Sequence, residues 1–194
     1  MKIYLIRHGE SASDVRQKYD GDYDDALTDQ GRKDAQQIAQ KLTDKGIQAI
    51  FSSVRARALE TAEIMRVVLK CELVIMEQLN EQNIYGAYPE LRADQPEEEY
   101  RRLGELLANR NASLPGVETY QQLKQRVARG WSEIATRPYH TVAVVTHGGP
   151  IRTIIRDILK QGELTDMSNG MVIELETIPV LKIVQVDGVR WREE

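Results

Sequence analysis

Short runs of apolar residues alternate along the chain with longer stretches in which apolar side chains recur every three or four positions. The short runs predict buried strands, and the periodic stretches predict amphipathic helices. Strands are expected at 3–6, 48–51, 72–76, 142–145, 172–175 and 182–186. Helices are expected at 31–45, 57–69, 96–110, 117–134 and 150–159, and Thr28 is the predicted cap of the first.

This alternation predicts an α/β fold, a three-layer α/β/α sandwich in which helices flank a mostly parallel central sheet. Ligands of such sheets bind beyond the carboxyl ends of the strands. The residues directly after each apolar run are therefore the first candidates for a functional site. The length of 194 residues favours a single domain over 1–194.

Composition narrows the class of protein. Apolar residues make up 41% and charged residues 29%, which is typical of a globular chain with a sizeable core. The net charge is −4, so nucleic acid is not expected as the main partner, although arginines can still gather around an anion. No apolar run reaches the length of a membrane span or a signal peptide, so we expect a cytoplasmic protein with no membrane partner. The single cysteine, Cys71, rules out an internal disulfide and is predicted to be a buried, unreactive thiol.

Two of the three histidines come directly after predicted strands, and a glycine follows each of them. His8 follows the first strand, and His147 follows the strand at 142–145. One histidine in this position would most simply be a core residue bonded to a backbone carbonyl. Two such histidines, accompanied by the strand-end arginines Arg7 and Arg57, favour a functional site instead.

A metal site built from His8, His147 and Glu81 is a competing interpretation, because two histidines and a carboxylate can hold a transition metal. Arg7 and Arg57 would place two permanent positive charges beside that cation, and Coulomb repulsion disfavours this arrangement. Two histidines and two arginines suit an anion, and the arginine fork suits phosphate best.

Pro150 adds support for an anion site. Proline is favoured in the first turn of a helix, so Gly149 is expected near the N-cap of the helix that follows His147. Backbone amides at that helix start could point at the same anion.

Four blocks of the sequence resemble the histidine phosphatase superfamily, also called the phosphoglycerate mutase-like family. In chain order they are Arg7-His8-Gly9-Glu10-Ser11, Ser52-Ser53-Val54-Arg55-Ala56-Arg57-Ala58, Leu79-Asn80-Glu81 and Val144-Val145-Thr146-His147-Gly148-Gly149. Leu27-Thr28 followed by Gly31 is similar to the segment before the family's first helix. The resemblance implies a phosphoglycerate mutase-like fold, one histidine phosphatase domain over 1–194, and a variable active-site cover at about 82–116.

The resemblance also implies a reaction, in which a phosphomonoester is hydrolysed through a phosphohistidine. The residue matching His8 attacks phosphorus, and Glu81 protonates the leaving oxygen and then activates water. The implied catalytic residues are His8, Glu81, His147, Arg7 and Arg57, and the implied phosphate site is Arg7, His8, Arg57, His147 and Gly148. No cofactor and no metal are expected, since cationic groups can stabilise the phosphoryl charge in place of a metal ion.

The departures from the family pattern concern the substrate. Asp14 stands where family members often carry asparagine, and Asp20 and Gly21 lie close to positions that the family uses around the substrate. Added negative charge there is expected to penalise highly anionic substrates, so these three residues are predicted to influence specificity. The aspartates between 22 and 25 are interpreted as a solvated acidic loop.

The predicted function is a metal-independent phosphomonoesterase whose partner is a small phosphomonoester substrate. A 2,3-bisphosphoglycerate-dependent phosphoglycerate mutase is the alternative, and the short, acidic cover argues against it. A phosphoprotein phosphatase stays open, because an open pocket would admit a phosphorylated side chain. A non-enzymatic binding module is disfavoured, since all five expected catalytic residues are present. The sequence does not name the substrate, and it leaves a homodimer open.

Overall fold

The computed structural model describes residues 1–16, 24–83, 98, 101–102, 105, 109–113, 115–177 and 182–192. Its strands are β1 Lys2–Arg7, β2 Ala49–Ser52, β3 Glu72–Ile75, β4 Thr141–Thr146, β5 Leu164–Glu176 and β6 Lys182–Trp191. Its helices are α1 Ala12–Arg16, α2 Asp29–Lys41, α3 Ala56–Leu69, α5 Tyr120–Thr136 and α6 Gly148–Thr153. Short helical turns follow three of these elements: η1 Thr43–Lys45 lies after α2, η2 Glu77–Leu79 after β3, and the π-turn η3 Ile154–Ile158 after α6.

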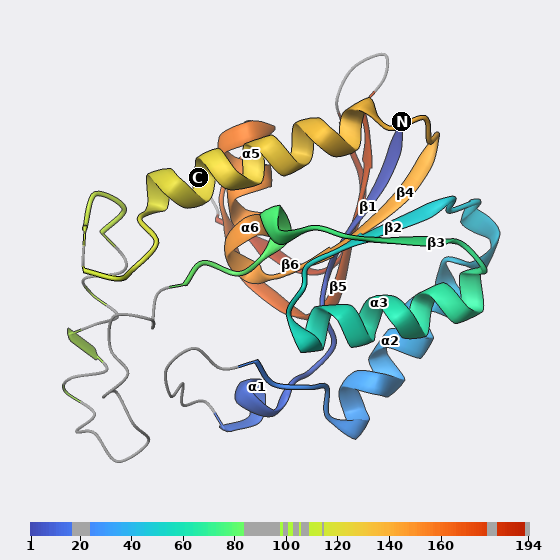
Figure 1. Ribbon diagram of the computed structural model, residues 1–194, viewed down its shortest axis with the longest axis horizontal. Coiled ribbons are helices and arrows are strands. Elements are labelled where there is room, and N and C mark those ends of the chain that lie inside the picture. The colour runs from blue at the N-terminus through green and yellow to red at the C-terminus, as the bar shows by residue number, and fades with distance from the viewer. Residues whose placement is uncertain are drawn as a thin grey trace.

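The six strands form one sheet in the order β3-β2-β4-β1-β5-β6. The first four strands in that order are mutually parallel, while β5 and β6 join as antiparallel partners. Helices α2 and α3 cover one face of the sheet, and α5 and α6 cover the other (Figure 1). The predicted three-layer α/β/α sandwich with a mostly parallel sheet is therefore confirmed.

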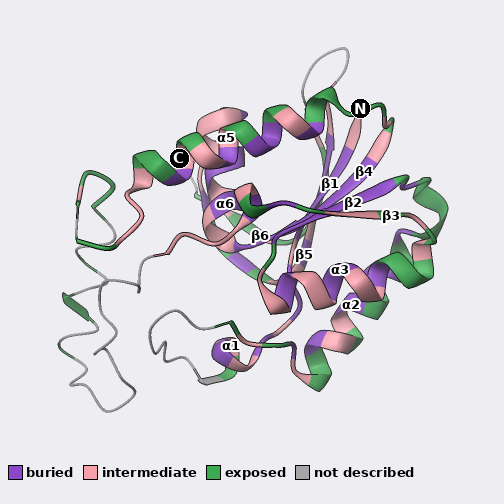
Figure 2. Ribbon diagram, in the orientation of Figure 1, coloured by how far each residue is buried: buried purple, intermediate pink, exposed green. Residues whose placement is uncertain are grey.

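The core is divided between the two faces of the sheet by the alternation of side chains along β1. Ile3 and Leu5 belong to the cluster under α5 and α6, and Tyr4 and Ile6 belong to the cluster under α2 and α3. The central strands are buried along most of their length (Figure 2). A buried isoleucine or leucine contributes about 1.5–3 kcal/mol each, so the four inner strands form the rigid base of the molecule.

Several element boundaries differ from those expected. The helix expected at 31–45 is α2, which ends at Lys41, and η1 then leads to Gly46 in the left-handed region with φ 67°. The strand expected at 172–175 is the end of a much longer strand, since β5 begins at Leu164 and pairs with β6 through several register shifts. The helix expected at 96–110 lies mostly outside the described residues.

The start of α6 corrects the expected N-cap. Its N-cap is His147, and the helix begins at Gly148 rather than after Gly149. Pro150 still lies in the first turn, where a missing amide proton costs nothing. Within the described part of the chain, no helix is long and apolar enough to cross a membrane.

Cys71 is less buried than expected. Its side chain has intermediate exposure and packs at the edge of the cluster beneath α2 and α3. Burial nevertheless raises the pKa of the thiol, which keeps it in its unreactive protonated form.

Candidate functional site

The carboxyl ends of three neighbouring strands bring the predicted site residues together. Arg7 at the end of β1 pairs with Thr146 of β4, and Ser52 at the end of β2 pairs with Val145 of β4. The residues that follow these strands therefore leave the sheet side by side. The rings of His8 and His147 lie 5.1 Å apart between centroids, with an angle of 59° between their planes.

The hydrogen bonds of His8 determine which ring nitrogen is free to react. Its Nδ1 lies 2.7 Å from the carbonyl oxygen of Gly9, so Nδ1 carries the proton and donates it. Its Nε2 accepts a hydrogen bond from Nε of Arg57 at 3.1 Å. Burial, followed by the charge of Arg57, lowers the pKa of His8 to about 3. His8 is thus held as a neutral imidazole with its lone pair on Nε2.

Two glycines allow the chain to turn so closely after β1. A Cβ atom on Gly9 would lie 2.4 Å from the carbonyl oxygen of Gly31, and a Cβ atom on Gly31 would lie 2.0 Å from that of Glu10. The amide of Gly9 donates to Thr61 Oγ1 at 3.1 Å, which ties the turn to α3. The backbones meet so tightly that any side chain at these two positions would displace His8.

His147 has the opposite tautomer. The hydroxyl of Ser53 donates to Oδ1 of Asn80 at 2.7 Å, so it accepts from Nε2 of His147 at 2.8 Å. Nδ1 of His147 is buried and has no hydrogen-bond partner among the described residues. Burial, helped by the nearby charge of Arg57, lowers the pKa of His147 well below its usual range. Ser53 and Asn80 lie within the family-like blocks, but their residue types alone gave no signal of this role.

Both predicted arginines lie close enough to His8 to lower its pKa, and Arg57 contacts its ring directly. Arg57 is in the first turn of α3 and is only 3% exposed. Arg7 donates from Nη1 to the carbonyl of Met167 at 2.5 Å and from Nη2 to Asp14 at 3.0 Å. Nε of Arg7 is buried without a hydrogen-bond partner among the described residues. Fixed positive charge therefore surrounds His8, as an anion site requires.

Asp14 is the counter-ion of Arg7 in this arrangement. Its carboxylate also accepts from the Ser11 hydroxyl at 2.6 Å and from the Ser11 amide at 2.9 Å. Burial alone would raise the pKa of Asp14, but the bonds from Ser11 and the charge of Arg7 lower it overall. Much of the negative charge expected to repel anionic substrates is thus already paired. The influence of Asp14 on specificity stays a prediction, and Asp20 and Gly21 lie outside the described residues.

Glu81 lies at the start of α6, next to His147. Its carboxylate accepts from the amide of Gly149 at 3.1 Å and from the amide of Gln82 at 2.8 Å. A Cβ atom on Gly149 would lie 2.3 Å from Oε1 of Glu81. The helix amide that was expected to face an external anion therefore binds a carboxylate of the protein itself.

The described residues include no group of three histidine, cysteine, aspartate or glutamate side chains placed to hold a metal ion. The structure instead places Arg7, His8, Arg57, His147 and Gly148 at one strand edge, with Glu81 beside them through Gly149.

The buried histidines predict that stability falls as the pH drops below neutrality. Their folded pKa values lie below the unfolded value of about 6.5, so in acid the unfolded chain binds protons that the folded chain does not. The contribution is fully present above pH ~6.5 and is lost progressively toward the folded values, by up to about 1.4 kcal/mol per pH unit for each histidine. Melting temperatures between about pH 5 and 8 should therefore fall less steeply in His147→Asn than in the wild type. The same substitution at the exposed His140 is the control, and equal slopes in all three proteins would contradict the prediction.

Comparison with known proteins agrees with the family resemblance of the sequence. The family model for the histidine phosphatase superfamily (branch 1) matches residues 3–184. Two proteins named "Probable phosphoglycerate mutase GpmB", from Erwinia tasmaniensis and Proteus mirabilis, are 28% and 27% identical over 162 residues, or 82% of this chain and 75% of each relative. Among solved structures, Bacillus stearothermophilus YhfR superposes with a TM-score of 0.80 at 25% identity, covering 96% of both chains. The alpha-ribazole phosphatase of Shigella flexneri has the same fold, with a TM-score of 0.78 at 22% identity over 95% of this chain and 96% of its own.

Proposed function

The chain belongs to the histidine phosphatase superfamily, and from this premise we propose that it is a metal-independent phosphomonoesterase acting on a small phosphorylated metabolite. The superfamily contains both phosphatases and mutases. The observation that carries the proposal is the state of His8, a buried neutral imidazole with its Nε2 lone pair between fixed positive charges. This is the form that a nitrogen nucleophile needs for attack on phosphorus.

In the first step of the proposed reaction, Nε2 of His8 forms a bond to phosphorus while the bond from phosphorus to the leaving oxygen breaks. Glu81 transfers a proton to that oxygen, so an alcohol leaves and a phosphohistidine remains. The Nε–H of Arg57, which now donates to Nε2 of His8, must turn to a phosphoryl oxygen to release the lone pair. Arg7 and Arg57 stabilise the charge that spreads over the phosphoryl oxygens.

In the second step, the Glu81 carboxylate removes a proton from water as the water oxygen bonds to phosphorus. The bond between phosphorus and Nε2 breaks, which returns His8 to its neutral form and releases inorganic phosphate. Nδ1 of His147, which has no partner among the described residues, could donate to a phosphoryl oxygen once it takes up a proton. Binding of a dianion would favour that protonated form.

A phosphoglycerate mutase is the second candidate, because the curated relatives carry that name. The two activities share the phosphohistidine and differ in what receives its phosphoryl group. Release of inorganic phosphate from many phosphomonoesters supports the phosphatase. Transfer to a phosphoglycerate, with a requirement for 2,3-bisphosphoglycerate, would establish the mutase instead.

The metal-independent mechanism predicts that phosphatase activity survives an excess of chelator and is inhibited by vanadate. The positive charges of Arg7 and Arg57 do the work of a metal ion, and vanadate mimics the trigonal phosphoryl group in the transition state. Initial rates with p-nitrophenyl phosphate, measured with and without EDTA, test the first part. Activity that EDTA removes and a divalent metal restores would overturn the mechanism.

A further inference from the structure

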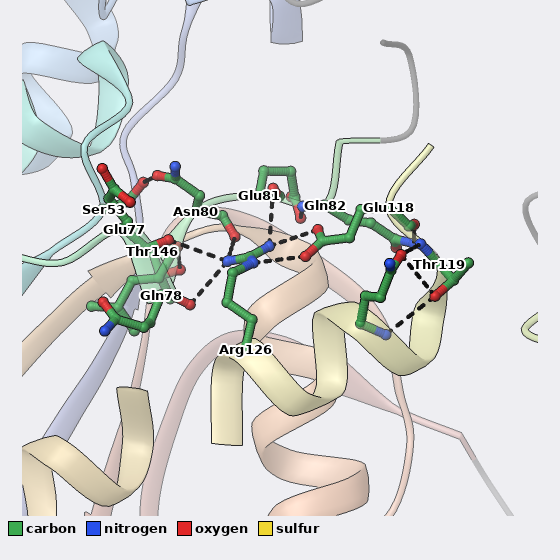
Figure 3. Close-up of polar contacts among 12 residues, drawn as sticks. Ser53, Glu77, Gln78, Asn80, Glu81, Gln82, Glu118, Thr119, Arg126 and Thr146 are labelled. Atoms are coloured by element: carbon green, nitrogen blue, oxygen red, sulfur yellow. Dashed lines mark hydrogen bonds and ion pairs between the residues drawn. The ribbon is translucent and has the colours of Figure 1, made fainter. Parts of the chain in front are cut away.

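One arginine of α5, Arg126, binds several backbone carbonyls of the segment that carries Glu81, residues 77–82 (Figure 3). Nη1 of Arg126 donates to the backbone carbonyls of Gln78 at 2.9 Å and Asn80 at 3.0 Å, and lies 3.3 Å from that of Glu77. Nη2 of Arg126 lies 3.4 Å from the carbonyl of Glu81 itself. We call residues 77–82 the acid segment. The guanidinium of Arg126 thus contacts carbonyls along nearly the whole length of the acid segment.

The guanidinium of Arg126 is itself held in place. Glu118 accepts from Nε and Nη2 of Arg126 at 2.7 Å each, in the parallel two-bond geometry that fixes an arginine most firmly. The side chains of Arg126 and Glu118 are only 18% and 17% exposed, so the pair is shielded from solvent and holds one orientation.

The far end of the acid segment is tied to the same glutamate through its backbone. The amide of Glu118 donates to the carbonyl of Asn83 at 2.9 Å, and the side chain of Gln82 donates to the carbonyl of Glu118 at 2.8 Å. At the other end, α5 lies directly against η2, since a Cβ atom on Gly130 would lie 2.7 Å from Cβ of Gln78. The acid segment is therefore held by α5 on one side of Glu81 and by Glu118, just before α5, on the other.

We propose that Arg126, paired with Glu118, is a positioning residue that sets where the Glu81 carboxylate lies relative to the phosphoryl site. The inference rests on the proposed function, in which Glu81 is the acid of the first step. Arg126 contacts backbone carbonyls of the acid segment, whereas no hydrogen bond joins it to Arg7, His8, Arg57 or His147 among the described residues. Its loss should therefore impair proton transfer and leave phosphate binding intact. A displacement of about 1 Å at a reacting group can cost about 10²-fold in rate.

The leaving group provides a readout that a general loss of structure would not give. An alkyl phosphate needs a proton on its leaving oxygen, whereas p-nitrophenyl phosphate releases a phenolate that is stable without one. In Arg126→Lys, the ammonium cannot bind both Glu118 oxygens and still reach the carbonyls. We expect the rate of phosphoenzyme formation to fall about 10- to 100-fold with β-glycerophosphate, and less than about 3-fold with p-nitrophenyl phosphate. Inhibition by vanadate should stay at the wild-type level.

Two further variants distinguish a displaced Glu81 carboxylate from a general loss of folded structure in Arg126→Lys. Arg129→Lys changes an exposed arginine on the next turn of the same helix and should leave both rates unchanged. Glu118→Gln removes the charge of Glu118 and one of the two oxygens that accept from Arg126. It should show the same dependence on the leaving group in weaker form, which provides a second test if Arg126→Lys does not fold. Melting temperatures of all variants report the folded fraction.

A double-mutant cycle with Glu81→Gln decides the matter. If Arg126 acts through Glu81, adding Arg126→Lys to Glu81→Gln should cause no further fall in the rate of phosphoenzyme formation from β-glycerophosphate. Additive losses, or equal slowing of both substrates by Arg126→Lys, would overturn the positioning role. If Glu81→Gln alone shows no dependence on the leaving group, the acid assigned in the proposed function is wrong, and this outcome is distinct from a failure of Arg126 alone.

Discussion

His8→Ala is expected to abolish turnover and, with it, the covalent phosphoenzyme. Among the described residues at this strand edge, His8 supplies the ring nitrogen whose lone pair already accepts an arginine N–H, that of Arg57. Removing a nucleophile typically costs about 10⁴-fold or more, because the remaining groups bind phosphate but form no bond to phosphorus. Rapid quenching after mixing with a radiolabelled phosphomonoester should reveal an acid-labile, base-stable label on the wild type and none on His8→Ala.

His147→Ala is the matched control for this experiment. His147 lies 5.1 Å from His8 between ring centroids and is equally buried, but its Nε2 donates to Ser53. The variant His147→Ala should therefore still form the labelled phosphoenzyme, but more slowly than the wild type. Label retained in His8→Ala and lost in His147→Ala would mean that the roles of the two histidines are reversed.

The meeting of the two histidines could be predicted from sequence because it depends on strong local signals. Each follows an apolar run and precedes a glycine, and parallel strands bring their carboxyl ends to one edge of the sheet. The pairing of Arg7 with Thr146 then places His8 beside His147 without any further assumption. The glycine at position 9 is visible in the sequence, whereas the reason for it, the close approach of the Gly31 backbone, becomes clear only in the fold.

The contacts that adjust the site could not be predicted in the same way. The bond from Asp14 to Arg7 pairs two charged side chains whose orientations depend on the fold around Ser11. The bond from Gly149 to Glu81 joins residues 68 positions apart and uses a backbone amide, which every non-proline residue possesses. The contacts of Arg126 with the acid segment also end on backbone carbonyls, so the sequence of that segment carries no trace of them.

The sequence pattern predicted only the end of β5, because contacts between backbones also determine where this strand begins. Its first half contains Asp166, Ser168 and Asn169, which have the polar character of a loop. Pairing with β6 nevertheless holds these residues in a strand, with register shifts between Met167 and Val172 where the two strands fall out of step. Backbone pairing across a hairpin outweighed the side-chain pattern from which strands are predicted.

Glu81→Gln is expected to slow phosphorylation of His8 in proportion to the leaving group's need for a proton. The amide keeps the size of the carboxyl group and can still accept from Gly149, but it has no proton to transfer. General-acid help is worth typically about 10²–10⁴-fold for an alkoxide and little for nitrophenolate. Steady-state rates would mix this effect with hydrolysis of the phosphohistidine, because the same carboxylate should activate water. The pre-steady-state rate of phosphoenzyme formation isolates the first step.

Gly149→Ala tests the same assignment without altering the carboxylate. The new methyl group would lie 2.3 Å from Oε1 of Glu81, so the flexible end of that side chain must move away while the backbone keeps its place. We expect the variant to fold stably. Its rate of phosphoenzyme formation should fall much more with β-glycerophosphate than with p-nitrophenyl phosphate, as is expected for Glu81→Gln. Equal slowing of both substrates in Glu81→Gln and Gly149→Ala would show that Glu81 is not the acid, and Glu10 and Asp14 would be the next candidates.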